Sequence, residues 1–303
     1  MHLVKLDPAS AIPAAHTFHA RLVRFNSQRL APQSPDAHWV DGIRAEALAR
    51  IAEGKFIEAE RAAISNAAAL APTDVEGFMR WFEGLEQNGP GQNDELFPWL
   101  ADMSTFEEMR WFLTQEAAGE AGFDDLVAMT QVKAPVRAKL EMAANYWDEM
   151  GRGHERGMHG PMLDAVVEEL ALMPSTHTTV WESLALANMM VGLATNRRYA
   201  YQSIGALGAI EMTAPGRVTL VNQGLSRLKV PSRARRYFQL HAGLDVQHSK
   251  SWNREVIAPL VATRPDLGRW IAEGALLRLS GGARCFARYR AHFGLLPAMR
   301  DAA

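Results

Sequence analysis

The chain has 303 residues, of which 48% are apolar and 22% charged, and these fractions are those of an ordinary folded protein. They exclude a disordered chain, a collagen-like repeat and a disulfide-rich scaffold. Lys and Arg number 32 against 34 Asp and Glu, so the formal charge of −2 provides no net positive field to attract a nucleic-acid backbone.

The sequence contains no segment that reads as a membrane span or a secretory signal. The most apolar stretch, residues 183–195, carries Asn188 and is shorter than the roughly 20 residues that cross a bilayer. The start, residues 1–21, lacks a continuous apolar region. Cys285 is the single cysteine and cannot form an internal disulfide, which fits a reducing compartment. We therefore expect a cytoplasmic protein with no membrane partner.

Helical spacing of apolar residues dominates the chain, and strand-like alternation is scarce. The pattern predicts an all-α fold. The expected helices cover residues 41–53, 56–69, 75–85, 106–130, 136–150, 161–172, 180–195, 198–212, 217–228, 232–250, 251–260 and 267–293.

Proline and glycine mark several expected breaks between helices. Residues 71–74, Ala-Pro-Thr-Asp, offer a stop followed by an N-cap, and residues 214–216, Ala-Pro-Gly, should end one helix before the next begins. The clearest loop is 87–94. We expect it to divide the chain into an N-terminal helical extension, 1–95, packed on the main body, and a larger helical domain, 96–303.

The first group of chemically active side chains lies on the helix expected at 232–250. At about 100° per residue, His241, Asp245 and His248 fall within a sector of about 60°. Two imidazoles and a carboxylate on one stripe suit iron, manganese or zinc. The alternative is a polar surface stripe, because His and Asp are common on exposed faces.

A second group surrounds the glycine-rich segment 149–159. Gly151, Gly153 and Gly157 are costly inside a helix, so the backbone should break there and bring Glu149 and His159 toward a common point. Competing ligand candidates in the same stretch are Asp148 and His154. The alternative is a helix end followed by a polar loop.

Further carboxylates occur in apolar surroundings. Glu211 follows the small residues of 205–209, which would let its helix pack closely and turn the carboxylate inward, although an acid near a helix end is the simpler explanation. Glu116 and Glu120 lie one turn apart beside apolar residues. Either could supply another ligand, or both could lie on a solvated face.

Taken together, these segments resemble the haem-oxygenase-like diiron oxidases and oxygenases, the iron-containing redox enzyme family. The resemblance covers roughly residues 105–295. It depends mainly on the order and spacing of Glu149, His159, Glu211 and the final His-x3-Asp-x2-His motif.

The resemblance implies a haem-oxygenase-like helical bundle that binds two iron ions, or manganese, and activates O2. The ligands it implies are Glu149, His159, Glu211, His241, Asp245 and His248, with Glu211 our candidate for the bridge between the ions. An extra carboxylate used by some members would fall on Glu120 or Glu116.

The expected function is therefore a non-haem diiron oxidoreductase that acts with O2 on a small organic substrate of the amino acid, amine or fatty acid type. Electrons would come from an external donor or from the substrate, and the chain could pair with a second copy of itself. An arginine fork at Arg197 and Arg198, or at Arg235 and Arg236, could hold a substrate carboxylate, although solvated helix ends are the simpler reading. The alternative is a cofactor-free or haem-binding protein of the same architecture without redox activity.

Overall fold

The computed structural model describes residues 8–35 and 37–295, and the first seven residues of the start segment lie outside this range. Within it the chain is helical and contains no strand, only an isolated bridge between Met150 and Met158. The all-α prediction is thus confirmed. The α-helices are α1 (Pro8–Leu30), α2 (Trp39–Ala68), α3 (Val75–Asn88), α4 (Leu96–Asp102), α5 (Phe106–Gly119), α6 (Phe123–Thr130), α7 (Val136–Glu149), α8 (His159–Glu169), α9 (Trp181–Thr195), α10 (Ala200–Arg227), α11 (Arg236–Ser251), α12 (Ala258–Thr263) and α13 (Leu267–Phe293).

Shorter helical turns join these elements. They are the 3-10 turns η1 (Gly151–Gly153), η2 (Glu155–Gly157) and η3 (Arg197–Tyr199), and a π-helical segment, η4 (Trp252–Ile257), which continues α11 into α12. In the described part of the chain, no helix combines the length and apolarity that crossing a bilayer would require.

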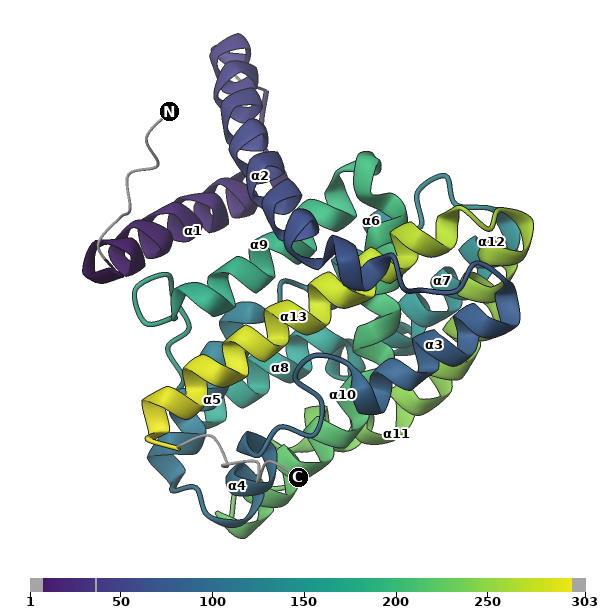
Figure 1. Cartoon of the computed structure of the whole chain (residues 1–303). Coiled ribbons are helices and arrows are strands. Elements are labelled where there is room, and N and C mark those ends of the chain that lie inside the picture. The colour runs from purple at the N-terminus through teal and green to yellow at the C-terminus, as the bar shows by residue number, and fades with distance from the viewer. Residues whose placement is uncertain (1–7, 36, 296–303) are drawn as a thin grey trace.

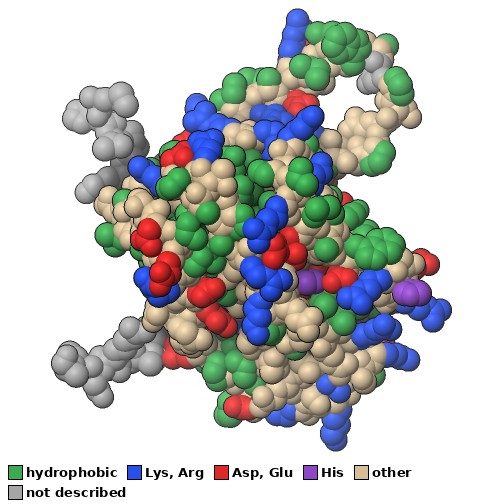
Figure 2. Space-filling model, turned by 90° about the vertical axis from the view of Figure 1, so that its right-hand side faces the viewer, with side chains coloured by type: hydrophobic (Ala, Val, Ile, Leu, Met, Phe, Trp, Pro, Cys, Tyr) green, Lys and Arg blue, Asp and Glu red, His purple; other side chains and the backbone are tan. Residues whose placement is uncertain are grey.

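The core is built around α9, whose residues are buried without interruption from Glu182 to Ala194. This helix packs against α1, α2, α5, α6 and α13, and α10 packs against α4, α11 and α13 (Figure 1). In that view the long α13 runs diagonally across the body, while the first part of α2 projects away from it. The projecting part carries exposed apolar side chains such as Trp39 and Ile43, and green side chains gather on the corresponding arm in Figure 2.

The helices α10 and α13 cross with their backbones in close approach. A Cβ atom added at Gly205 would lie 1.9 Å from the carbonyl oxygen of Ile271, and one added at Gly274 would lie 1.8 Å from that of Gln202. Only glycine fits at both positions. The crossing holds the first half of α10, and with it Glu211, against the core.

One of the helix boundaries predicted from proline and its neighbours agrees with the structure, and another does not. Asp74 caps α3 by accepting a hydrogen bond from the Gly77 amide at 2.7 Å, as expected. The predicted stop at Pro215 is wrong, because α10 continues through it. A proline removes one helical hydrogen bond, and the packing of α10 against neighbouring helices such as α4, α11 and α13 outweighs that loss.

A second correction concerns the single helix expected at 106–130. The chain breaks between α5 and α6, where Ala121 and Gly122 adopt positive φ angles of 66° and 73°. The Glu120 carboxylate accepts hydrogen bonds from the amides of Gly122 and Phe123, each at 2.8 Å, and so satisfies the start of α6. Helices α1 and α4 were not predicted, and the helices expected at 41–53 and 56–69 are one continuous α2.

The two-domain division at residue 95 stays a prediction. On the N-terminal side, α1 contacts α9 and α2 contacts α13, so both helices pack on the larger body.

Candidate metal centre

A tight loop between α7 and α8 brings Glu149 and His159 together. Glu149 is the last residue of α7 and His159 the first of α8, and the turns η1 and η2 fold the chain back between them. Gly151 has a φ of 59°, and a Cβ there would lie 2.4 Å from the backbone of Gly157. The glycines thus permit a loop closure that leaves Glu149 Oε2 2.8 Å from His159 Nδ1.

The other candidate ligands come from α10 and α11. Glu211 on α10 is buried, and so are His241, Asp245 and His248, which share one face of α11. The stripe seen in the sequence therefore faces the protein interior rather than solvent. Including Glu149 and His159, all six residues are at most 6% exposed.

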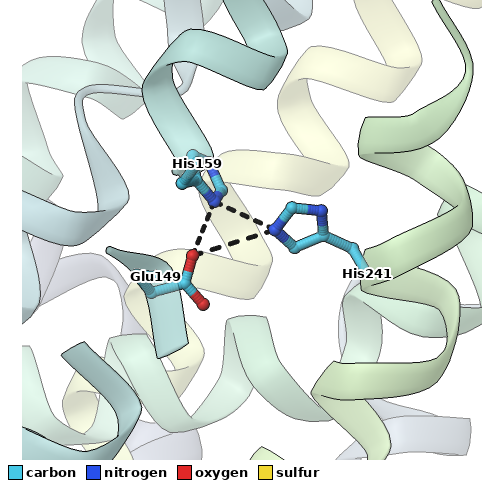
Figure 3. Close-up of side chains that lie close together, drawn as sticks. All are labelled: Glu149, His159 and His241. Carbon is cyan, nitrogen blue, oxygen red and sulfur yellow. Dashed lines mark hydrogen bonds and ion pairs between the residues drawn. The ribbon is translucent and has the colours of Figure 1, made fainter. Parts of the chain in front are cut away.

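Three of these side chains form a first cluster, drawn in Figure 3. His159 Nδ1 lies 2.8 Å from Glu149 Oε2 and 3.0 Å from His241 Nε2, and the latter two atoms are 3.8 Å apart. His241 Nδ1 donates to the Tyr237 carbonyl at 2.7 Å, so its Nε2 presents a lone pair to the cluster. His159 Nε2 donates to Glu120 at 3.0 Å.

A second cluster shares Glu149 with the first. His248 Nδ1 lies 3.6 Å from Glu211 Oε2 and 3.8 Å from Glu149 Oε1, and it has no hydrogen-bond partner in the described structure. The other ring nitrogen, Nε2, lies 3.1 Å from Asp148 Oδ2, to which it donates. Asp148 therefore orients His248 with its free nitrogen toward the two glutamates.

The buried charges perturb one another strongly. Burial alone would raise the pKa of Glu149, but the hydrogen bond from His159 and the neighbouring His241 ring lower it to about 2. Burial and the neighbouring charge of Glu211 raise the pKa of Asp245 well above its usual value. Burial alone would lower the pKa of His159, but the neighbouring carboxylates of Glu120 and Glu149 raise it well above 6.5. A proton on His159 Nδ1 thus holds the first cluster together.

The donor set fits divalent metal ions. Two donors each about 2.1 Å from one ion lie about 3.0 Å apart at a right angle and about 3.4 Å apart at a tetrahedral angle, close to the spacings seen in both clusters. The ligand atoms of each cluster lie within 4.8 Å of one another. His248 Nδ1 and Asp245 Oδ1 are buried without a hydrogen-bond partner, and an ion is the kind of partner that such acceptors lack.

The structure also separates the competing residues of the sequence. Glu120 contacts His159, whereas Glu116 lies elsewhere on the cavity wall and accepts a hydrogen bond from the Tyr289 hydroxyl at 3.0 Å. His154 is exposed on the loop. Glu149 belongs to both clusters and Glu211 to one, so Glu149 joins Glu211 as a candidate bridge. Asp245 belongs to neither cluster as the side chains now lie.

A cavity of about 170 Å³ adjoins these residues. Its walls are mostly apolar, and the residues that line it include Glu149, His159, Glu211, His241 and Asp245. Two further lining residues, Arg217 and Arg278, were not singled out from the sequence. The two arginine pairs considered as a carboxylate-binding fork, Arg197 with Arg198 and Arg235 with Arg236, do not line this cavity.

Comparisons with known proteins agree with this description. A family of iron-containing redox enzymes matches residues 110–283, a range that includes every candidate ligand. A CADD-like protein of unknown function from Nostoc punctiforme PCC 73102, known from a crystal structure, is 15% identical with a TM-score of 0.50, and the match covers 80% of this chain and 98% of that one. At such low identity the likeness shows the fold alone. No curated protein matches the chain.

Proposed function

The chain belongs to the iron-containing redox enzyme family, and on that premise we propose that it is a non-haem diiron enzyme that uses O2 to oxidise or oxygenate a small organic substrate. The observation that carries the proposal is the pair of buried clusters that share Glu149. Each offers carboxylate and imidazole donors, the set that suits iron or manganese.

In this proposal, Glu149, His159 and His241 hold one ion, and Glu149, Glu211 and His248 hold the other. Asp245 would complete the set by turning its unpaired oxygen toward either ion. Iron bound there would supply the electrons and open coordination positions with which O2 is activated. Three carboxylates offset most of the charge of two divalent ions.

The surrounding residues fix the donors in place. The Tyr237 carbonyl and the Asp148 carboxylate each accept from the outer nitrogen of a histidine, which leaves the inner nitrogen of His241 and His248 directed at the clusters. Glu120 does the same for His159. With His159 Nδ1 as a metal ligand instead of a proton donor, Glu120 would keep the ring oriented.

The cavity beside the clusters is the natural substrate chamber, because it is enclosed by apolar side chains such as Phe112, Leu113 and Phe238. Such walls exclude bulk water from the reacting groups. Electrons beyond those of the substrate would come from an external donor.

The test is to measure iron per chain and O2 uptake on protein expressed with added iron. We expect close to two irons in the wild type, and fewer in His248→Ala and Asp245→Ala, with helical circular dichroism unchanged because the apolar core carries the fold. His154→Ala is the matched control, since that histidine is an exposed loop residue. Normal iron content in both ligand variants would overturn the proposal.

A further inference from the structure

The cavity wall carries two chemically different groups of side chains, here called the metal end and the arginine end. The metal end is formed by the metal-ligand candidates, and the arginine end by Arg217 of α10 and Arg278 of α13. Both flank Phe286. The Arg217 guanidinium carbon lies 5.6 Å from the centroid of that ring, and an atom added at Gly282 would touch both Arg278 Nη1, at 2.9 Å, and Phe286 Cζ, at 3.6 Å.

Neither arginine has an anionic partner within ion-pair distance among the described residues. Arg217 donates to Thr213 Oγ1 at 3.1 Å and lies 3.5 Å from Gln92 Oε1, both neutral acceptors. No hydrogen bond or ion pair in the described part of the chain engages the Arg278 guanidinium. Charged groups in a protein interior are normally paired, so two such guanidiniums require an explanation.

The electrostatics of this end leave room for one negative charge. Burial, and to a smaller extent the like charge of Arg278, lower the pKa of Arg217 to about 9, while Glu116 opposes the shift. Burial lowers the pKa of Arg278 as well. Burial raises the pKa of Glu116, and the Tyr289 hydroxyl and both arginines oppose that shift. With Glu116 ionised, the three groups sum to a single positive charge. A monoanion would balance it, and the planar guanidinium group matches a carboxylate through two parallel hydrogen bonds.

The distance between the two ends sets the length of such a ligand. Glu211 and Arg217 lie six residues apart on α10, a rise of about 9 Å along the helix. Most of the remaining wall is apolar and includes Phe97, Leu113 and Val218. The space suits a short alkyl chain or a single ring.

From this arrangement we propose that Arg217 and Arg278 bind the carboxylate of the substrate, which is a small monocarboxylic acid with an apolar body. The carboxylate lies at the arginine end, and the body extends toward the metal clusters. This inference rests on the proposed function, because it takes the same cavity as the substrate chamber.

The test uses hexanoate as the probe, with hexanamide and hexylamine as analogues of the same length that lack the negative charge. Binding is measured by calorimetry on the full chain, both iron-loaded and after removal of metal with a chelator. We expect hexanoate to bind both forms at least about tenfold more tightly than either analogue, since one charge-assisted contact is worth about that factor.

Two substitutions locate the subsite. Arg278→Met and Arg217→Met keep an apolar side chain of similar length, and each should weaken hexanoate binding at least about tenfold while iron content and circular dichroism stay at wild-type values. The matched control is Arg233→Met, which removes an arginine that is 79% exposed and paired with Glu169 on the surface. Hexanoate binding should be unchanged there.

The outcomes separate this inference from the proposed function. Hexanoate binding no tighter than hexanamide binding, or unaffected by both cavity substitutions, overturns the carboxylate subsite even if the protein binds two irons and consumes O2. Hexanoate binding that occurs only with iron present and ignores both substitutions overturns it too, because the carboxylate then binds the metal. Arginine-dependent binding in a protein that takes up no iron supports the subsite and counts against the diiron proposal alone.

Discussion

The crossing of α10 and α13 should not tolerate a methyl group, and Gly274→Ala tests this. The added Cβ would lie 1.8 Å from the Gln202 carbonyl oxygen, so the helices must separate by about 1 Å or more to restore van der Waals contact. Overpacking against rigid backbone costs about 3 kcal/mol, and alanine returns up to about 1 kcal/mol through its helix propensity. The net loss is about 2 kcal/mol, or about 3 °C in the melting temperature of a chain this long.

Thermal unfolding followed by circular dichroism measures the effect, and Gly54→Ala is the control. Gly54 also lies inside a helix, but a Cβ there meets nothing within 4 Å, so alanine should raise the melting temperature by about 1 °C. Because α10 carries Glu211, Gly274→Ala should also lower iron content. Equal melting temperatures for the two variants would refute the close-crossing argument.

Three further predictions follow from the buried charges. Glu211→Gln should bind at most one iron per chain, and Glu149→Gln, which affects both clusters, should bind less; two irons and retained O2 uptake in Glu211→Gln would place the bridge elsewhere. Asp148→Ala removes the acceptor that orients His248 and should weaken metal binding about tenfold in a titration, so an unchanged affinity would argue against that role. Burial, with smaller effects from nearby positive charges, lowers the pKa of His19 to about 4, so the unfolded chain binds the proton more tightly. The unfolding free energy should therefore fall by about 3 kcal/mol as pH drops from 6.5 to 4, and His19→Gln should flatten this slope in denaturant titrations.

The sequence predicted the fold class and the family because both depend on local signals. Helical periodicity identifies buried faces without knowledge of the partners that cover them, and the α11 stripe is such a face. The glycines of 151–157 indicated a backbone break by another local signal, because each glycine destabilises a helix that contains it, whatever its tertiary contacts. That five of the six implied side chains lie in two clusters with a shared Glu149 is a fact of three-dimensional packing.

The errors arose where tertiary packing outweighed a local preference. Pro215 lies inside α10 because contacts with α4, α11 and α13 hold the helix on both sides of it. The break before α6 went unpredicted because Ala121 adopts a positive φ angle that the residue type does not indicate. Glu120 could have been read as a capping residue, since it stands three positions before the first residue of α6 and a carboxylate can satisfy its free amides.

The roles of Asp148 and Arg278 could not have been derived from sequence, because each depends on a partner far along the chain. Asp148 and Glu149 are neighbours on α7, and consecutive helical residues point about 100° apart. Only the position of His248, 100 residues later, decides that Asp148 is the carboxylate that accepts from its outer nitrogen, Nε2. Arg278 lies on α13, where Arg269, Arg284 and Arg290 each pair with an acid, and only its place on the cavity wall distinguishes it from these three. A single helix, α10, carries both Glu211 at the metal end of the cavity and Arg217 at the arginine end. The rise of α10 therefore sets the separation of the two ends. A substrate recognised at the arginines would therefore present to the metal clusters the atoms furthest from its carboxylate, and the length of its apolar body would decide which carbon lies nearest to the iron.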